Sequence, residues 1–179
     1  SGADIRMIYS PLDALKIAMD YPDKEIVFFA IGFETTTPPT ALAVQIAQRD
    51  RIKNFSVFCN HVLTPAAMRH ILTESQSLAS QRLTIDGIVG PAHVSAVIGC
   101  KPYQEIAKNF TKPIVIAGFE TLDILQALLM LLRQVNTQRA DIENQYDRAV
   151  TDQGNYSAID AMARSEEHTS ELQSHSFIS

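Results

Sequence analysis

The sequence predicts an α/β protein with a three-layer, doubly wound and mainly parallel five-stranded sheet. Short segments rich in Ile, Val and Phe alternate along the chain with segments of helical pattern, which is typical of this fold class. The apolar residues of Val27–Ile31 and of Ile114–Ala117 are continuous rather than alternating, as in strands that are covered on both faces. With 179 residues, of which 46% are hydrophobic and 20% charged, the chain has the size and composition of one globular domain.

The expected strands combine β-branched or aromatic residues with turn-forming residues at their ends. They are expected at Asp4–Tyr9, Glu25–Ile31, Phe55–Asn60, Ile85–Gly90 and Pro113–Gly118. Because parallel strands end at one edge of a sheet, the loops that follow these strands are expected to face one cleft.

Three helices are expected to begin with a hydroxyl residue followed by proline. Ser10 precedes Pro11, and Asp13 supplies the carboxylate of a capping box. Thr37-Pro38 and Thr64-Pro65 repeat the pattern. Further helices are expected at Ala92–Ile98, Tyr103–Asn109 and Leu122 to about Gln134. The apolar residues of the last one cover most of its circumference, which predicts a helix buried on more than one side.

The chain is expected to hold an α/β domain over residues 1–137 and the helical start of a further part over residues 138–164. Residues 165–179 are rich in Ser and have no periodic apolar face, so we expect a non-native or disordered tail there. The first residues show neither an initiator Met nor a signal sequence, and we expect the chain to be a piece of a longer protein.

Several functional classes are disfavoured by the composition. The longest apolar stretch, Ile124–Leu132, is far shorter than the roughly 20 residues that a membrane span needs. The net charge is −5 and no cluster of Lys and Arg is present, which argues against a nucleic-acid partner. Cys59 and Cys100 fit neither a disulfide framework nor a zinc site, so a reducing cytoplasm is expected. No glycine-rich dinucleotide or P-loop motif is present.

The candidate catalytic residues are His93, Glu34 and Glu120, each of which follows an expected strand. An imidazole at the start of a helix can carry protons or act as a ligand. The two carboxylates could transfer protons, but a carboxylate is also favoured at a helix N-terminus for structural reasons alone.

The candidate binding residues lie in the same loops: Gly32, Thr35, Thr36, His61 and Gly118. The glycines would let the backbone approach a ligand, or would only supply the conformational freedom that a tight turn needs. Cys59 is expected on the same strand face as His61, where the two could ligate iron or form a nucleophile pair. The alternative is an inert thiol, which is also the expectation for Cys100.

The loop sequences, taken in order, resemble the HypD family of hydrogenase maturation factors. The resemblance covers about residues 4–155, and its matching blocks are Gly32-Phe33-Glu34-Thr35-Thr36, Cys59-Asn60-His61-Val62, Gly90-Pro91-Ala92-His93-Val94-Ser95, Val97-Ile98-Gly99, Ala117-Gly118-Phe119-Glu120, Leu122-Asp123 and Glu143-Asn144-Gln145-Tyr146. The family usually has proline where Thr121 stands and glycine where Ala92 stands. Its N-terminal cysteine motifs and its C-terminal cluster-binding cysteines have no counterparts here, so the chain resembles only the middle of such a protein.

The resemblance implies a scaffold on which iron acquires cyanide and carbon monoxide before insertion into nickel–iron hydrogenase. It implies two related α/β domains around a cleft, a 4Fe–4S cluster in the parent protein, and a HypC-type chaperone and a HypE-type protein as partners. His93 would line the cleft, and Glu34, Thr35 and Glu120 would shape it. The fragment itself would hold no cofactor and would be inactive.

Two alternatives remain open from the sequence. One is a small-molecule α/β enzyme that uses His93 with Glu34 or Glu120 as acid and base. The other is an interaction module that docks through the apolar helix Leu122–Gln134, which burial of that helix within the monomer would argue against.

Overall fold

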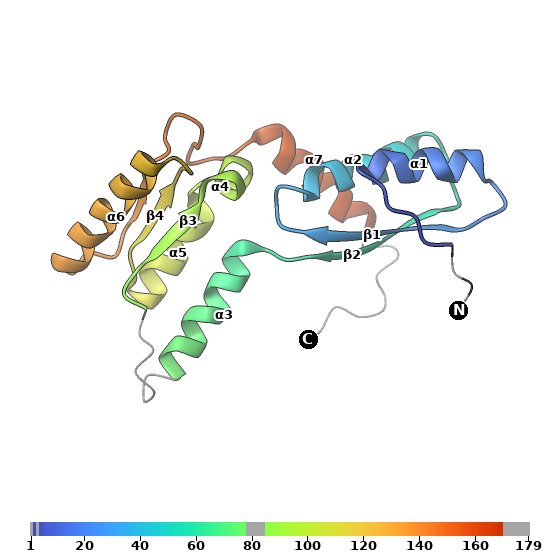
Figure 1. Cartoon of the computed structure of the whole chain (residues 1–179). Coiled ribbons are helices and arrows are strands. Elements are labelled where there is room, and N and C mark those ends of the chain that lie inside the picture. Colours follow the sequence, from blue (N-terminus) through green and yellow to red (C-terminus); the bar gives the residue numbers. More distant parts are fainter. Residues whose placement is uncertain (1, 3, 78–84, 170–179) are drawn as a thin grey trace. The chain divides into compact units, whose positions relative to one another are not determined.

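The computed structural model describes residue 2, residues 4–77 and residues 85–169. The elements follow one another in a largely alternating order (Figure 1): α1 (Pro11–Asp20), β1 (Ile26–Gly32), α2 (Thr37–Arg49), β2 (Phe55–His61), α3 (Thr64–Ser77), β3 (Ile88–Pro91), α4 (Ala92–Ile98), α5 (Lys101–Phe110), β4 (Ile114–Ala117), α6 (Thr121–Asn136), β5 (Ile142–Asn144) and α7 (Tyr156–Thr169). The predicted α/β class is confirmed.

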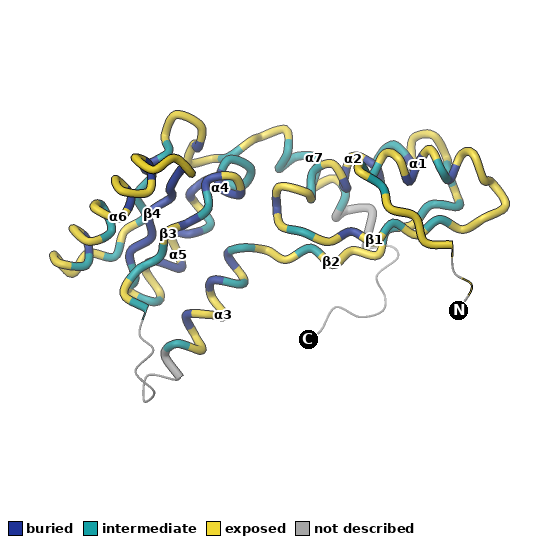
Figure 2. Tube along the Cα trace, in the orientation of Figure 1, coloured by how far each residue is buried: buried dark blue, intermediate teal, exposed yellow. Residues whose placement is uncertain are grey.

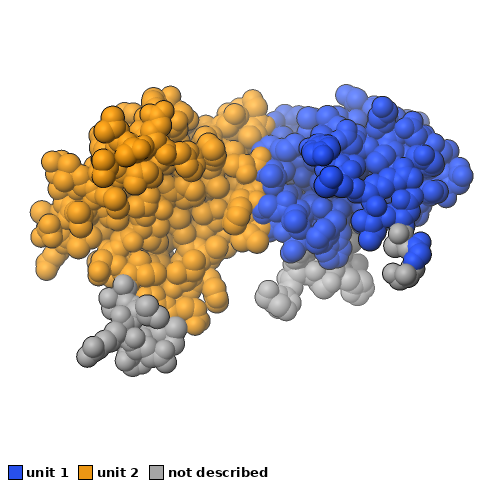
Figure 3. All heavy atoms as spheres, in the orientation of Figure 1, with its two compact units in different colours: residues 1–32, 36–61, 160–179 blue, residues 33–35, 62–159 orange. Residues whose placement is uncertain are grey.

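The chain divides into two compact units (Figure 3), and each is made of separate stretches of sequence. Unit 1 contains residues 1–32, 36–61 and 160–179, and unit 2 contains residues 33–35 and 62–159. These boundaries differ from those expected at residues 137 and 164, and the assignment of segments to the domains of a longer protein stays a prediction. Of the expected tail, residues 165–169 end α7, and residues 170–179 lie outside the described part of the chain.

Unit 1 is built on two parallel strands. β1 pairs with β2 from Ile26 opposite Phe55 to Gly32 opposite His61. Helices α1 and α2 pack together and against these strands, with a small core around Leu15, Ala43 and Ala47.

Unit 2 is a three-layer sandwich around a parallel sheet with the strand order β3-β4-β5. All four residues of β4 are buried, and they alternate between the two faces of the sheet. Ile114 and Ile116 belong to the core beneath α3 and α5, whereas Val115 and Ala117 pack against α6. The prediction that this strand is covered on both faces is therefore confirmed.

The single five-stranded sheet predicted from the sequence is wrong for the described residues, which form a two-stranded and a three-stranded sheet. Asp4–Tyr9 is not a strand, because the segment pairs with neither sheet. Conversely, Ile142–Asn144 is a strand, which its three residues, two of them polar, did not indicate.

Two apolar surfaces that were expected to be covered are exposed in this chain (Figure 2). On β1 and β2, the side chains of Val27, Phe29, Ile31 and Phe58 are each more than half exposed. On α6, Leu122, Leu125, Leu129 and Leu132 are between 48% and 77% exposed. The prediction that the long helix is buried on more than one side is therefore wrong, since only the side that bears Ala127 faces the sheet.

The helix starts follow the sequence signals closely. Ser10 caps α1, and Asp13 completes the capping box. For α2 the N-cap is Thr36, one residue earlier than expected, and its side chain makes no capping bond. Helix α3 begins at Thr64 itself, so here too the residue expected as the N-cap is the first residue of the helix.

Candidate functional site

His93 lies in the first turn of α4, directly after β3. Its neighbours Ala92 and Val94 are buried, which leaves the imidazole exposed at the surface. The ring centroid lies 4.3 Å from that of Phe119, with an interplanar angle of 45°. Since β3 and β4 run parallel with Pro91 opposite Ala117, the loops that follow them meet at one edge of the sheet. The structure thus brings His93 to the loop Gly118–Glu120.

The loop Gly118–Glu120 is held by hydrogen bonds on both sides of Phe119. The Gly118 N–H donates to Gln145 Oε1 at 3.1 Å, and Gln145 Nε2 donates to Asp123 Oδ1 at 2.9 Å. The Glu120 N–H donates to Asp123 Oδ2 at 3.4 Å. A Cβ on Gly118 would lie 2.1 Å from Asp123 Oδ2 and 2.5 Å from the Tyr146 ring, so the absence of a side chain is what allows this packing.

Asp123 and Arg148 form the ion pair at the centre of this network. Arg148 Nη1 and Nη2 donate to the two carboxylate oxygens of Asp123 at 2.9 and 2.6 Å, a bidentate arrangement. The guanidinium carbon also lies 4.0 Å from the centroid of the Tyr146 ring. The hydrogen bonds from Arg148 lower the pKa of the buried Asp123 carboxyl to about 2. Asp123 is therefore ionised at neutral pH.

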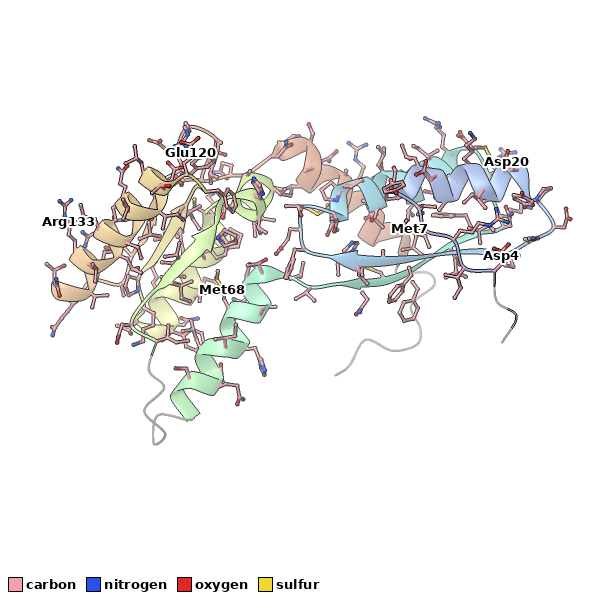
Figure 4. All side chains as sticks on the ribbon, in the orientation of Figure 1. Asp4, Met7, Asp20, Met68, Glu120 and Arg133 are labelled. Carbon is pink, nitrogen blue, oxygen red and sulfur yellow. The ribbon has the colours of Figure 1, made fainter. Side chains whose placement is uncertain are left out.

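Glu120 lies where the chain enters α6, at the opposite end of that helix from Arg133 (Figure 4). Its side chain is 82% exposed, and its Oε2 lies 3.8 Å from Arg148 Nη2. Such an exposed ion pair constrains the carboxylate little. Glu120 therefore stays accessible next to Phe119 and is able to exchange protons with a ligand at this edge.

Glu34 has a different position from the one the sequence suggested. Both of its carboxylate oxygens accept hydrogen bonds from Thr64, from the N–H at 2.7 Å and from Oγ1 at 2.8 Å. Glu34 is 2% exposed, and Thr64 is the first residue of α3. A carboxylate at this point satisfies unpaired N–H groups and complements the helix dipole. Glu34 thus stabilises the start of α3. The structural role considered from the sequence would have placed Glu34 at the start of α2, the helix that follows it in the chain.

Beneath α4, Tyr103 joins this helix to α5. Its hydroxyl lies 3.4 Å from Ser95 Oγ, which in turn donates to the Pro91 carbonyl at 2.8 Å. Burial raises the pKa of Tyr103 to about 12; the bond to Ser95 opposes this rise, and the Glu34 carboxylate adds to it. Tyr103 therefore stays neutral and fixes the helix that carries His93.

The candidate binding residues other than Gly118 are divided between the two units. Gly32, Thr36 and His61 belong to unit 1, and Thr35 is exposed in unit 2. At Gly32 the φ angle is +138°, and a Cβ would lie 2.3 Å from Thr36 Oγ1. This favours the alternative that the glycine supplies the conformational freedom of a tight turn.

Cys59 and His61 lie on one face of β2, as expected. Cys59 Sγ is 3.4 Å from His61 Nδ1. Burial lowers the pKa of His61, so the imidazole is neutral at pH 7 and does not form an ion pair with the thiol. Among the described residues, no three His, Cys, Asp or Glu side chains come together as a metal site would require.

Four residues of this network were not among the sequence candidates: Phe119, Asp123, Gln145 and Arg148. Asp123 stands three residues after Glu120, and this spacing is a capping signal that could have identified it. Gln145 lies in one of the motif blocks. Arg148 had no local signal, because its partner is 25 residues away in the chain.

A groove of about 630 Å³ lies elsewhere, in unit 1, between residues 4–8, α1 and β1. It is lined by no candidate residue, and its walls are largely apolar side chains such as Ile8, Ile17 and Phe28. In the part of the chain that the structure describes, no helix is both long and apolar enough to cross a membrane.

Together, the fold and this edge define an α/β protein with an accessible histidine and carboxylate at the ends of two parallel strands. The chain belongs to the HypD family: the family model described as "Hydrogenase formation hypA family" matches residues 1–174.

Individual relatives agree with this membership. The chain is 62% identical over 157 residues to the hydrogenase expression/formation protein HupD of Azotobacter chroococcum, covering 88% of this chain and 41% of that protein. It is 60% identical over 157 residues to the hydrogenase maturation factor HypD2 of Bradyrhizobium diazoefficiens, with the same coverage. The HypD of Escherichia coli is 44% identical over 162 residues, which cover 90% of this chain and 42% of the relative. The chain thus spans about two fifths of the length of the curated relatives it matches.

The 4Fe–4S cluster that the resemblance implies for the longer protein does not fit the residues of this chain. Such a cluster is usually held by four cysteine thiolates, and the sequence has two cysteines. Cys100 is buried in unit 2, where burial raises its pKa to about 11, and Cys59 belongs to unit 1.

Proposed function

We propose that this chain is the α/β portion of a HypD-type maturation factor, and that the longer protein is the scaffold on which iron receives cyanide and carbon monoxide. The observation that carries the proposal is the exposed His93, held against Phe119 beside Glu120 at one edge of the β3-β4-β5 sheet. The family membership and the names of the relatives, which are hydrogenase maturation proteins, support it.

In this proposal His93 and Glu120 act on the iron-bound ligands, which are cargo. The nitrogen of a metal-bound cyanide is a hydrogen-bond acceptor, and an imidazole N–H is a donor of suitable geometry. Glu120 exchanges protons with the ligands or with water beside them. The cysteines that hold the iron belong to other parts of the longer protein. A HypC-type chaperone and a HypE-type protein are the proposed partners, and the cytoplasm is the proposed compartment.

Glu34 has a supporting role in this proposal. Both of its oxygens are occupied by Thr64, and the side chain is buried, so it is poorly suited to exchange protons with a substrate. The alternative of a small-molecule enzyme that uses His93 with Glu34 or Glu120 as acid and base is not supported, because the relatives are hydrogenase maturation proteins and the Glu34 oxygens are occupied. Glu34 instead shapes the site by fixing the start of α3.

The test is the variant His93→Ala in a full-length protein that carries this sequence, expressed in a host that lacks its own copy. Hydrogenase activity in the cell extract is expected to fall by at least about tenfold, which corresponds to loss of a charge-assisted or similarly strong contact. His70→Ala is the matched control, because His70 is an exposed histidine on α3 in the same unit. Normal hydrogenase activity with His93→Ala would refute the proposal.

A further inference from the structure

The segment that follows β5 contacts the loop that touches His93. The Gln145 side chain accepts a hydrogen bond from the Gly118 N–H and donates one to Asp123. Arg148 donates hydrogen bonds to both carboxylate oxygens of Asp123. Asp123 in turn accepts a hydrogen bond from the Glu120 N–H. The residues before and after Phe119 are thus both fixed by the same group of side chains.

Phe119 is the connection from this group to the imidazole. It is 61% exposed, so few other contacts determine where its ring lies. Its ring lies against the His93 ring at a centroid distance of 4.3 Å, slightly closer than the roughly 4.5 to 7 Å typical of aromatic pairs, so the two rings are in direct contact. The backbone of the loop therefore determines where the Phe119 ring lies and, through it, the orientation of His93.

We infer that Gln145 and Arg148 are positioning residues for His93, which act by fixing the loop Gly118–Glu120 so that Phe119 holds the imidazole at the edge of the sheet. The inference rests on the proposed function for its biological meaning. Its structural part concerns only the contacts of this chain. Neither Gln145 nor Arg148 contacts His93 in the structure, so neither is a catalytic residue.

The geometry explains why these residue types are needed. A carboxamide can accept from Gly118 and donate to Asp123 at the same time, which neither a carboxylate nor a hydrocarbon side chain can do. A guanidinium can bond to both oxygens of Asp123 at once and lie flat on Tyr146, whereas a lysine ammonium is a point charge. Tyr146 packs against Gly118 on the side where a Cβ would stand.

The test is the NMR spectrum of the His93 imidazole in the folded chain, with His93→Gln used to assign its signals among the five histidines. The nearby Phe119 ring displaces the His93 resonances, and Phe119→Leu gives their position without that ring. In Gln145→Leu we expect the displacement to fall by at least about half, because the Gly118 N–H and Asp123 Oδ1 lose their shared partner. Arg148→Lys keeps the charge but not the two parallel bonds, and an intermediate displacement is expected.

The matched control is Arg139→Met, which removes exposed ion pairs with Asp141 and Glu143 from the same segment of unit 2. It is expected to leave the His93 signals unchanged. If Gln145→Leu and Arg148→Lys lower the melting temperature but leave the His93 signals in place, the two residues are merely structural and the inference is wrong.

The two proposals fail separately. The NMR displacement tests the positioning of His93, whatever the imidazole does. Hydrogenase activity with His93→Ala tests whether the imidazole takes part in the function, and it does not depend on which residues position the imidazole. Should Gln145→Leu fail to fold, as shown by collapse of amide signal dispersion, Arg148→Lys decides the question alone, since it keeps the charge balance of the buried Asp123.

Discussion

Asp123 is a carboxylate that is buried yet remains charged, because Arg148 bonds to both of its oxygens. Its pKa is about 2 in the folded chain, below the ordinary value of 3.8. A group whose pKa is lowered by folding binds fewer protons in the folded state than in the unfolded state. Its contribution to stability is therefore present above the unfolded pKa and is lost as the pH falls toward the folded pKa.

We accordingly predict that the melting temperature of the chain falls between about pH 4 and pH 2 because Asp123 becomes protonated and its bond to Arg148 weakens. The variant Asp123→Asn is expected to be less stable at pH 7 and to change less across this interval. Thermal unfolding followed by circular dichroism at closely spaced pH values measures both. Parallel curves for the two proteins between pH 4 and pH 2 would contradict the prediction.

Glu34 gives the second residue-scale prediction. Because Glu34 satisfies the first N–H of α3 and the Thr64 hydroxyl, Glu34→Ala is expected to lower the free energy of unfolding by about 1 to 2 kcal/mol. Glu34→Gln keeps one acceptor oxygen and should lose less. Urea denaturation measures the change, and Glu105→Ala, at an exposed position on α5, is the control that should leave it nearly unaltered. Equal stability of Glu34→Ala and the control would mean that the cap contributes nothing.

At the scale of elements, the turn between α4 and α5 packs backbone against backbone on residues 151–155. Gly99 and Gly154 both have positive φ angles, +79° and +73°, and the Asp152 carbonyl accepts the Cys100 and Lys101 N–H groups at the start of α5. A Cβ on Gly99 would lie 2.3 Å from the Asp152 oxygen, and one on Gly154 would lie 2.4 Å from the Val97 oxygen. No side chain fits between the two segments.

Gly99→Ala and Gly154→Ala are therefore each expected to destabilise the chain by about 1 to 3 kcal/mol, through strained φ together with steric overlap. Gly2→Ala separates the two causes, because Gly2 has a φ of +78° but no atom within 4 Å of the added Cβ. Chemical denaturation of the three variants should show a smaller loss for Gly2→Ala, which has the strained φ without the steric overlap, than for Gly99→Ala and Gly154→Ala. Losses of the same size at all three positions would show that backbone strain alone matters.

The elements that the sequence predicted correctly have local signals. The start of α1 is marked by three signals within four residues, namely Ser10, Pro11 and Asp13. The continuous apolar run of β4 is long enough to be recognised as a buried strand. Asp4–Tyr9 has the composition of a strand, but no other strand pairs with it. In contrast, β5 pairs with β4 although its composition is not typical of a strand. Pairing is a property of the folded chain, so neither case could be decided from the segment itself.

The same reasoning applies to the candidate site. The rule that loops meet at the carboxyl ends of parallel strands correctly placed His93 and Glu120 at one edge, because their strands are neighbours. It could not assign Glu34, which follows a strand of the other sheet and whose bonding partner is 30 residues away. Arg148 lies in an irregular segment without periodicity, where no pattern could identify it.

At the scale of the whole molecule, the two exposed apolar surfaces explain why composition alone was a poor guide to burial. The leucines of α6 and the residues Val27, Phe29, Ile31 and Phe58 look like core residues in the sequence, but within this chain they face solvent. Contiguous exposed apolar surface of this kind is unusual for a monomer that is complete in itself.

We predict that the chain binds the dye ANS in its folded state, because the dye adsorbs to such surfaces. The double variant Leu125→Gln/Leu129→Gln should lower the dye fluorescence by about a third while changing the free energy of unfolding by less than about 0.5 kcal/mol. Leu42→Gln, at an exposed leucine of α2 in the other unit, is the control and should have a smaller effect on the fluorescence. Unchanged fluorescence in the double variant would show that the α6 surface does not bind the dye.

The division of the sequence between the units has a consequence for synthesis. The chain passes from one unit to the other after residues 32, 35, 61 and 159, so unit 1 needs residues that lie before and after the long continuous stretch of unit 2. Gln45 in α2 donates a hydrogen bond to the Ala161 carbonyl, a partner that is synthesised 116 residues later. Helices α1 and α2 and strands β1 and β2 must therefore wait until the segment that contains Ala161 has been synthesised before unit 1 is complete, whereas residues 62–159 of unit 2 are a continuous stretch that can fold as it is translated.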